Sequence, residues 1–416
     1  MPTLRPRGSA KRRWLGVAGL VAVLLVAGGV LALGLARGWF DEGSIEGTTE
    51  GFEPAQAPLG AAAAGSWPEF GFDPERTRAN PALRLRPPFR QEWSYDAGSL
   101  LEFPPVLGDG RAVVGTNAGL AVAVDLETGR LQWRVRLRGR VASSPALSGD
   151  LALFTTIRGD LVALRAATGE EVWRRRVGSA VESSPLVIGE TAYVGTLAGR
   201  VLSLDVRTGG VRWSADAAGD VKASLALAGP NVVVGDYAGR VTAFRSSDGR
   251  VAWQRESPGE ALRGAGRFYG GPAVAYGRVY IGNVNGRVIA LDRDSGEIAW
   301  VRVLDDYVYS SPAVSEQTVI VGSYDHRVHA LDAVTGRPRW TFDAGERVSG
   351  SASVIGDVVY ASTLARIPRE GRTFALDVRT GRRLWTFPDG RYSPAVAVRG
   401  LLVLTGVRTL YGLVPR

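Results

Sequence analysis

Ala330-Leu-Asp-Ala-Val-Thr-Gly-Arg-Pro-Arg-Trp340 is the stretch of this 416-residue chain that decides the fold. Its pattern, Ala-x-Asp-x-x-x-Gly-x-x-x-Trp, occurs seven times with small changes, and the Gly always stands four residues before the Trp. The seven pairs are Gly129/Trp133, Gly169/Trp173, Gly209/Trp213, Gly249/Trp253, Gly296/Trp300, Gly336/Trp340 and Gly381/Trp385. An eighth tryptophan, Trp93, precedes them, and successive tryptophans stand 40 to 47 residues apart. A period of this length indicates a repeat protein.

Each repeat contains four short runs of apolar and β-branched residues, with turn residues between them. In the unit that ends near Trp340, the runs lie at 310–314, 318–322, 327–332 and 337–342. Such alternation over a few residues predicts strands. Thr335-Gly336 supplies the positive-φ position of a tight hairpin between the last two of them. Four antiparallel strands in about 40 residues are typical of one blade of a β-propeller.

Side-chain size increases from the first run of a unit to the last. The first run is small, as in Ser143-Ser-Pro-Ala146 and Ser310-Ser-Pro-Ala313, whereas the last run carries the tryptophan. The inner strands of a propeller converge on its axis, and large rings fit better where the blades diverge. We therefore predict that eight tryptophans dock blade against blade: Trp93, Trp133, Trp173, Trp213, Trp253, Trp300, Trp340 and Trp385.

The two ends of the repeat region are incomplete in complementary ways. Trp93 has Phe89 in place of the Gly and lacks the first three runs of a unit. Three runs follow Trp385, at 393–396, 401–404 and 409–413, without a fourth. We expect the Trp93 strand to complete that last blade, which gives an all-β, eight-bladed β-propeller of four-stranded blades over residues 67–416. A seven-bladed ring with loose ends is the alternative.

The N-terminal region reads as a membrane anchor. Residues 1–13 are basic, and residues 14–36 carry no charge and are long enough to span a bilayer core of ~30 Å. Because acidic residues follow, the positive-inside rule predicts a cytoplasmic tail, one transmembrane helix and a propeller in the periplasm or outside the cell. A cleaved signal peptide with a small-x-small site at Gly34-Leu-Ala36 is the alternative, although its apolar core is usually shorter.

Three further segments interrupt the regular pattern. Residues 37–66 are rich in Gly, Ala, Pro, Thr and Glu, which predicts a flexible linker, with docking along the propeller as the alternative. Residues 67–81 form an irregular lead-in. Extra residues within 256–269 and around 365–371 predict longer loops, which are either binding elements or tolerated drift.

Composition excludes some functions. The chain has no cysteine, so disulfides and thiolate metal sites are absent. Its net charge is +9, and Lys11 and Lys222 are its only lysines. This charge reflects either a compositional preference for Arg or an anionic partner such as lipid headgroups. No basic cluster is interleaved with stacking aromatic residues, so we predict no nucleic-acid partner.

The repeat resembles the pyrroloquinoline-quinone (PQQ)-type propeller repeat, over residues 67–416 and including the lead-in Trp67-Pro-x-Phe-Gly-x-Asp73. The resemblance implies the fold, but the repeat residues are structural. Quinoprotein dehydrogenases of this family hold the quinone and Ca²⁺ on the axis, commonly under a disulfide of adjacent cysteines. This chain has no cysteine, and no Glu/Asn/Asp set matches those ligands. It looks more like the non-catalytic branch, typified by the outer-membrane assembly scaffold, a lipoprotein anchored through a Cys.

Few residues suggest chemistry. His326 and His329 stand three apart on a predicted strand and face opposite sides, so they cannot share a metal. We predict no catalytic, cofactor-binding or metal-binding residue. Asp305 and Asp306, with Tyr307 and Tyr309, stand in a loop between blades and are candidates for binding a cation or an Arg of a partner, with a solvated loop as the alternative.

Together these features predict a membrane-anchored, extracytoplasmic, non-enzymatic scaffold that binds a protein partner. The alternatives are a quinone-dependent oxidoreductase and a propeller that binds or senses extracellular glycan.

Overall fold

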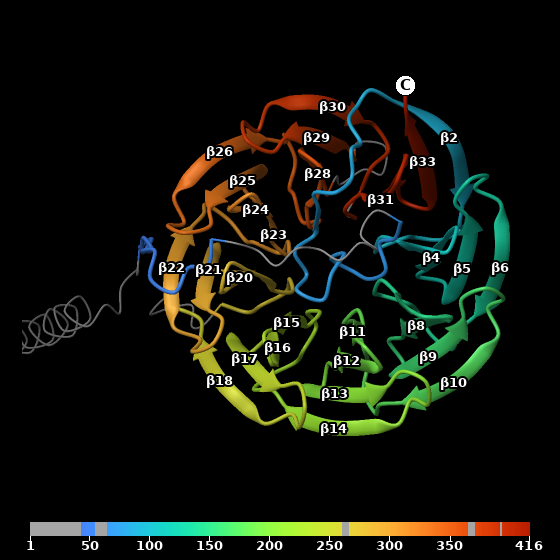
Figure 1. The fold of residues 1–416 in the computed structure, drawn as a ribbon, viewed down its shortest axis with the longest axis horizontal. Helices are drawn as coiled ribbons and strands as arrows, with labels where there is room; N and C mark the ends of the chain where they lie inside the picture. Colours follow the sequence, from blue (N-terminus) through green and yellow to red (C-terminus); the bar gives the residue numbers. More distant parts are fainter. Residues whose placement is uncertain (1–42, 55–64, 260–265, 365–370, 392) are drawn as a thin grey trace, which may run out of the picture. The chain divides into compact units, whose positions relative to one another are not determined.

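The computed structural model describes residues 43–54, 65–259, 266–364, 371–391 and 393–416. All of the described strands belong to one compact unit. The strands make eight sheets around a common centre, as Figure 1 shows. The prediction of an all-β, eight-bladed propeller is therefore confirmed, and the seven-bladed alternative is wrong.

Seven blades follow one another along the chain. Blades one to three are β3 (Val106–Gly108), β4 (Arg111–Gly115), β5 (Leu120–Asp125) and β6 (Leu131–Arg136); β7 (Ala146–Ser148), β8 (Leu151–Thr155), β9 (Asp160–Arg165) and β10 (Glu171–Arg176); and β11 (Leu186–Ile188), β12 (Thr191–Gly195), β13 (Arg200–Asp205) and β14 (Val211–Asp216). Blades four and five are β15 (Ala226–Ala228), β16 (Asn231–Gly235), β17 (Arg240–Arg245) and β18 (Val251–Glu256); and β19 (Ala273–Ala275), β20 (Arg278–Gly282), β21 (Arg287–Asp292) and β22 (Ile298–Val303).

The remaining blades include the two ends of the ring. Blade six is β23 (Ala313–Ser315), β24 (Thr318–Gly322), β25 (Arg327–Asp332) and β26 (Pro338–Asp343). Blade seven is β27 (Ser353–Ile355), β28 (Val358–Ser362), β29 (Thr373–Asp377) and β30 (Arg383–Phe387), to which β1 (Ala79–Asn80) adds in parallel. Blade eight is β31 (Val396–Val398), β32 (Leu401–Thr405), β33 (Thr409–Pro415) and β2 (Phe89–Asp96).

The tryptophans lie between neighbouring blades. Seven indole N–H groups donate to a carbonyl of the next blade at 2.8 to 3.0 Å: Trp93 to Leu126, Trp133 to Ala166, Trp173 to Val206, Trp213 to Ser246, Trp253 to Arg293, Trp300 to Ala333 and Trp340 to Val378. The motif Gly of that next blade lies against the same ring, at φ between 66° and 76°. A Cβ added there would stand 2.4 to 2.8 Å from tryptophan atoms. Glycine therefore both adopts the left-handed conformation that the turn requires and leaves room for the tryptophan ring.

The composite blade joins the two ends of the propeller. Strand β2 pairs antiparallel with β33, from Phe89 opposite Pro415 to Asp96 opposite Thr409, with the register shift before the tryptophan that the other blades also have. The ring of Phe89 stands in the motif Gly position and packs against Trp385, with centroids 5.4 Å apart. This packing accounts for the one unit without a Gly.

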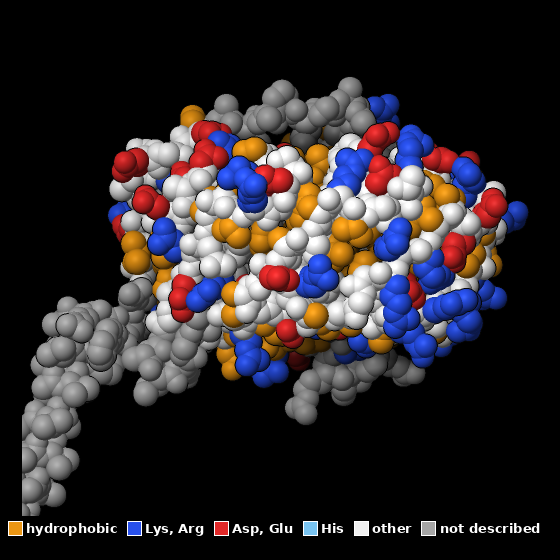
Figure 2. All heavy atoms as spheres, turned by 90° about the horizontal axis from the view of Figure 1, so that it is seen from below, with side chains coloured by type: hydrophobic (Ala, Val, Ile, Leu, Met, Phe, Trp, Pro, Cys, Tyr) orange, Lys and Arg blue, Asp and Glu red, His pale blue; other side chains and the backbone are white. Residues whose placement is uncertain are grey.

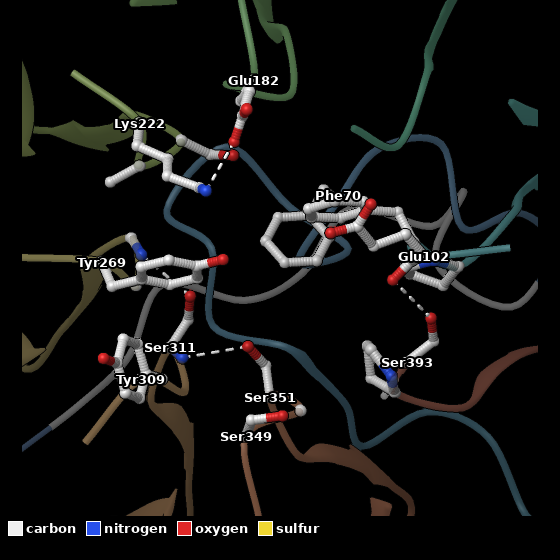
Figure 3. Close-up of a pocket in the computed structure, with 18 of the residues that line it drawn as sticks. Phe70, Glu102, Glu182, Lys222, Tyr269, Tyr309, Ser311, Ser349, Ser351 and Ser393 are labelled. Carbon is white, nitrogen blue, oxygen red and sulfur yellow. Dashed lines mark hydrogen bonds and ion pairs between the residues drawn. The ribbon is translucent and has the colours of Figure 1, made fainter. Parts of the chain in front are cut away.

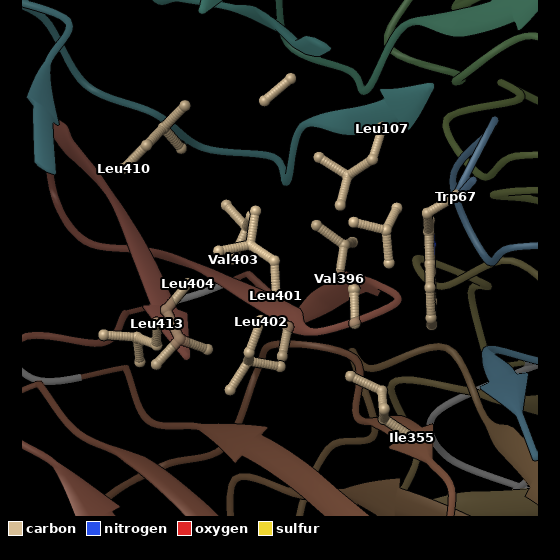
Figure 4. Packing of buried hydrophobic residues seen from close by; sticks show 14 of the residues in the cluster. Trp67, Leu107, Ile355, Val396, Leu401, Leu402, Val403, Leu404, Leu410 and Leu413 are labelled. Atoms are coloured by element: carbon tan, nitrogen blue, oxygen red, sulfur yellow. The ribbon is translucent and has the colours of Figure 1, made fainter. Parts of the chain in front are cut away.

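Burial of C-terminal side chains stabilises this closure. Leu402, Val403, Leu404 and Leu413 lie in one buried cluster that reaches Trp67 of the lead-in, Leu107 of blade one and Ile355 of blade seven (Figure 4). The cluster therefore bridges segments from both ends of the chain.

Part of the predicted linker docks on the propeller. Ile45 forms an antiparallel bridge with Val301 of β22, and the N–H of Gly47 donates to the carbonyl of Thr335 at 3.1 Å. Phe52 stacks on Tyr276 at 5.4 Å. For residues 43–54, the docked alternative therefore holds in place of the flexible linker, because the outer edge of β22 offers unpaired backbone groups. Residues 37–42 and 55–64 of the predicted linker lie outside the described residues.

No helix in the described part of the chain is long and apolar enough to cross a bilayer. The predicted tail, 1–13, and transmembrane helix, 14–36, lie outside the described residues.

Candidate functional site: an axial pocket above the lead-in

The lead-in, residues 67–81, crosses the centre of the ring (Figure 1). Its carbonyls accept N–H groups from the first strands of six blades at 2.7 to 2.8 Å: Trp67 from Leu107, Pro68 from Leu147, Pro74 from Leu227, Glu75 from Val274, Thr77 from Val314 and Arg78 from Val354. In blade three, the N–H of Val187 donates to the carboxylate of Glu69 at 3.2 Å. The lead-in thus pairs the inner edges of seven blades, which would otherwise leave buried N–H groups unsatisfied.

Buried charges fix the lead-in to the ring. The Arg76 guanidinium is fully buried, lies 3.0 Å from the Glu69 carboxylate and donates to the carbonyls of Leu225 and Pro185. Burial raises the pKa of Asp73 to about 7, although hydrogen bonds from Thr77 oppose this shift. The lead-in is therefore an integral part of the core.

A cavity of 370 Å³ opens on the axis, and Phe70 of the lead-in lines it. The other lining residues come mainly from the loops that lead into the first strands of seven blades. Figure 3 shows Phe70 and Glu102 across the cavity from Tyr269 and Tyr309, with Glu182 and Lys222 beside them. We call this cavity the axial pocket.

The serines of the repeat link neighbouring blades around the pocket. The N–H groups of Ser144 and Ser184 donate to the hydroxyls of Ser184 and Ser224 at 3.0 Å. Those of Gly271 and Ser311 donate to the hydroxyls of Ser311 and Ser351 at 2.9 Å. The second residue of each Ser-Ser-Pro run therefore has a structural role.

The residue two positions before the second residue of each Ser-Ser-Pro run, or its equivalent in the other blades, differs from blade to blade. Around the ring it is Glu102, Ala142, Glu182, Lys222, Tyr269, Tyr309, Ser349 and Arg391. The preceding residue is a buried apolar one in seven blades: Leu101, Val141, Val181, Val221, Phe268, Val308 and Val348. Six of the eight variable residues line the pocket: Glu102, Glu182, Lys222, Tyr269, Tyr309 and Ser349. The chemical differences between blades at this repeat position therefore lie mostly in the axial pocket.

Lys222 pairs with Glu182 within the pocket, and Glu182 also lies 3.7 Å from Arg140. The Lys222 ammonium lies 2.6 Å from the Glu182 carboxylate and 4.5 Å from the centroid of the Tyr269 ring. Burial alone would lower the pKa of Lys222, but hydrogen bonds to Glu182 and Tyr269 outweigh it and leave that pKa raised. The ammonium therefore stays charged and fixed.

An aromatic wall faces them. Tyr309 packs against Tyr269 and Tyr324 with centroids 4.7 Å apart in both pairs, and Tyr307 lies 5.8 Å away. The guanidinium of Arg347 lies 5.2 Å from the Tyr324 centroid. Burial raises the pKa of Tyr309, so its phenol is neutral at physiological pH. The rings of Tyr269 and Tyr324 are therefore each in contact with a cation of this chain, Lys222 and Arg347 respectively.

The structure separates the four predicted partner-binding residues. Tyr309 lines the pocket, and Tyr307 is 45% exposed beside it. Asp305 pairs with Arg327 at 3.2 Å, and the Asp306 carboxylate accepts the N–H of Tyr307 at 2.7 Å. Neither aspartate lines the pocket.

Sequence reasoning missed most of the pocket. Glu102, Glu182, Lys222 and Tyr269 received no role, although comparison of the repeats at this one position would have revealed their variability. Two pocket residues flank the predicted insertions: Tyr269 ends the first, and Leu364 immediately precedes the second.

The pocket does not fit the quinone and Ca²⁺ that the resemblance raises. A protein-bound Ca²⁺ takes six to eight oxygen ligands. The described residues contain no group of three or more His, Cys, Asp or Glu side chains that could hold a metal. The pocket offers the carboxylates of Glu102 and Glu182, and Lys222 already occupies the second.

Charge on the outside of the ring is mixed. Arg, Lys, Asp and Glu side chains lie next to one another over much of the side drawn in Figure 2. Arg212 pairs with Asp205 at 2.6 Å, and Arg174 with Glu171 at the same distance. The chemical asymmetry of the pocket is therefore the more distinctive feature.

These features define a closed, tryptophan-docked propeller of eight blades with a pocket on its axis. The chain belongs to the family described as outer membrane protein assembly factor BamB, whose model matches residues 90–156, 143–304 and 260–395. No curated protein matches the chain.

Solved structures share the fold at low identity. BamB from Moraxella catarrhalis is 18% identical, with a TM-score of 0.68 over 79% of this chain and 100% of the other. A europium-containing methanol dehydrogenase is 15% identical, with a TM-score of 0.70 over 84% and 90%. The quinohemoprotein alcohol dehydrogenase from Comamonas testosteroni is 15% identical, with a TM-score of 0.71 over 85% and 81%. At these identities the likeness concerns the fold alone.

Proposed function

We propose that the chain is a membrane-anchored scaffold that binds partner proteins outside the cytoplasm and catalyses no reaction. The observation that carries this proposal is the axial pocket, whose lining differs from blade to blade at one repeat position. Membership of a family described as an assembly factor supports a role in holding proteins together. Interaction surfaces are typically enriched in Tyr, which the pocket wall provides.

Anchoring through the uncharged segment 14–36 is part of the same proposal. Residues 43–54 dock on β22, so the six residues 37–42 separate the predicted helix from the ring.

Co-purification tests the scaffold. The intact protein is cross-linked in its native membranes, solubilised and recovered, and associated proteins are quantified against membranes that lack it. We expect a small set of extracytoplasmic proteins to be enriched reproducibly. Recovery of no specific protein would contradict the scaffold, and release of the protein by alkaline washing would contradict the anchor.

A quinone-dependent oxidoreductase is the second candidate, favoured by the likeness to the two dehydrogenases. The poor fit of the pocket to a Ca²⁺–quinone pair opposes it. Adding pyrroloquinoline quinone and Ca²⁺ to the purified protein decides between the two, with a bound chromophore and dye reduction expected of an enzyme and neither expected of the scaffold.

A further inference from the structure

One carboxylate that lines the axial pocket, that of Glu102, has no ion-pair partner among the described residues. Among its charged lining residues, Lys222 and Glu182 pair at 2.6 Å, and Glu182 also lies 3.7 Å from Arg140. The Glu102 side chain is half-buried. A partly desolvated carboxylate of this kind favours a cationic ligand group, because charge-assisted hydrogen bonds are the strong ones.

The aromatic wall favours the same ligand. A cation over the face of a tyrosine ring is attracted by the quadrupole of the ring. The ring faces of Tyr269 and Tyr324 already accept Lys222 and Arg347, at 4.5 and 5.2 Å from the ring centroids. Arg78 likewise lies 4.6 Å from the centroid of Phe70. The geometry around the pocket thus repeatedly places a cation against a ring.

We propose, on the basis of the scaffold function, that the axial pocket binds an arginine side chain from an extended segment of a partner protein. The guanidinium pairs with Glu102, and the aromatic wall with Tyr309 lines the opposite side of the pocket. Arginine suits the site better than lysine because its planar group stacks on rings and meets a carboxylate through two parallel N–H groups. The partner backbone then crosses the pocket mouth near Tyr307.

The alternative occupants differ in chemistry. A carboxylate ligand would have to displace Glu182 from Lys222, which leaves the Glu182 carboxylate with only its 3.7 Å contact to Arg140. A sugar would use the aromatic wall and the serine hydroxyls but would leave Glu102 without a cation. Both occupants are therefore outcomes of the test.

Ligand-observed NMR on the full-length protein in detergent micelles tests the proposal. The probes are capped pentapeptides of alanine with a central arginine, citrulline, lysine or glutamate, free arginine, and a chitin oligosaccharide. We expect the arginine peptide to bind, and to lose at least tenfold in affinity when citrulline replaces arginine. Lysine should bind more weakly than arginine, and free arginine more weakly than the peptide.

Two variants assign the binding to the pocket. Glu102→Gln should weaken the arginine peptide at least tenfold, whereas the matched control Glu127→Gln, in an exposed turn away from the pocket, should leave its affinity unchanged. Circular dichroism confirms that both variants fold. Equal binding of citrulline, tighter binding of the glutamate peptide or the oligosaccharide, or no effect of Glu102→Gln would overturn the proposal.

The same variant separates this inference from the scaffold itself. If Glu102→Gln co-purifies with the same partners as the natural protein, the arginine site is wrong and the scaffold stands. If neither protein recovers a partner, the scaffold fails.

Discussion

At the scale of the residue, the motif glycines have two simultaneous roles. Gly336 has a φ of 71°, and a Cβ there would stand 2.7 Å from the Trp300 ring. Gly345 has a φ of 74° with open space around it. Comparing the same substitution at Gly336 and at Gly345 therefore separates the cost of backbone strain from the cost of the clash with the Trp300 ring.

We predict that Gly336→Ala destabilises the protein more than Gly345→Ala. The left-handed conformation costs each alanine about 1–2 kcal/mol. Overpacking against Trp300 adds about 1–3 kcal/mol to the first variant alone. Urea unfolding followed by tryptophan fluorescence measures both, and equal losses would show that the ring contact contributes nothing.

Asp73 predicts a pH dependence of stability. Its pKa is about 7 in the folded protein against an ordinary 3.8. Between these values the folded state holds a proton that the unfolded chain has lost, so the free energy of unfolding falls as the pH rises from about 4 to about 7. The slope from one such group is at most about 1.4 kcal/mol per pH unit.

Asp73→Asn removes this titration while keeping an acceptor for the N–H of Thr77. We expect its urea midpoint to fall less than that of the natural protein between pH 5 and pH 7. The solvent-exposed control Asp216→Asn should keep the natural slope. Identical slopes in all three proteins would contradict the assignment.

At the scale of the element, the lead-in is held by a buried ion pair. Arg76→Met leaves the Glu69 carboxylate buried without its counter-charge and should cost about 3–5 kcal/mol. The double variant Glu69→Gln with Arg76→Met removes that isolated charge and should recover part of the loss. Chemical denaturation measures both, and a double variant less stable than Arg76→Met would contradict this account.

Elements also mark the limit of what the sequence can predict. The tryptophan period and the missing Gly before Trp93 predicted the blades and their closure, because these residues pack locally in every unit. The lead-in around Arg76 and the docking of Ile45 depend on edges that exist only once the ring has closed. Their own sequences have no period, so a reading of the repeats could not place them.

The axial pocket could be predicted from the sequence only in part. The sequence singled out Tyr309 because it stands close to two aspartates and another tyrosine. Glu102 and Lys222 stand more than a hundred residues apart in the sequence and line the same pocket only in the closed ring. Their signal is variation at one repeat position, which becomes informative once that position is known to face a cavity.

At the scale of the whole molecule, ring closure depends on β2 and β33. Ser94 and Tyr411 stand opposite each other in that pair, and the natural chain has no cysteine. We predict that a disulfide in the double variant Ser94→Cys with Tyr411→Cys stabilises the ring by about 2–4 kcal/mol and slows unfolding. The reduced form of the same variant is the control. Failure of the pair to oxidise, or equal unfolding rates, would contradict closure at this strand.

The scaffold proposal also concerns the whole molecule, because seven blades contribute to one pocket. Site-specific photo-cross-linking in native membranes tests it most directly, with the reactive group at Tyr307 beside the pocket or at Glu127 away from it. We predict that a discrete partner protein is captured from position 307, that Glu102→Gln abolishes the capture, and that position 127 captures none. Capture from position 127 alone, or capture from 307 that does not depend on Glu102, would contradict the account.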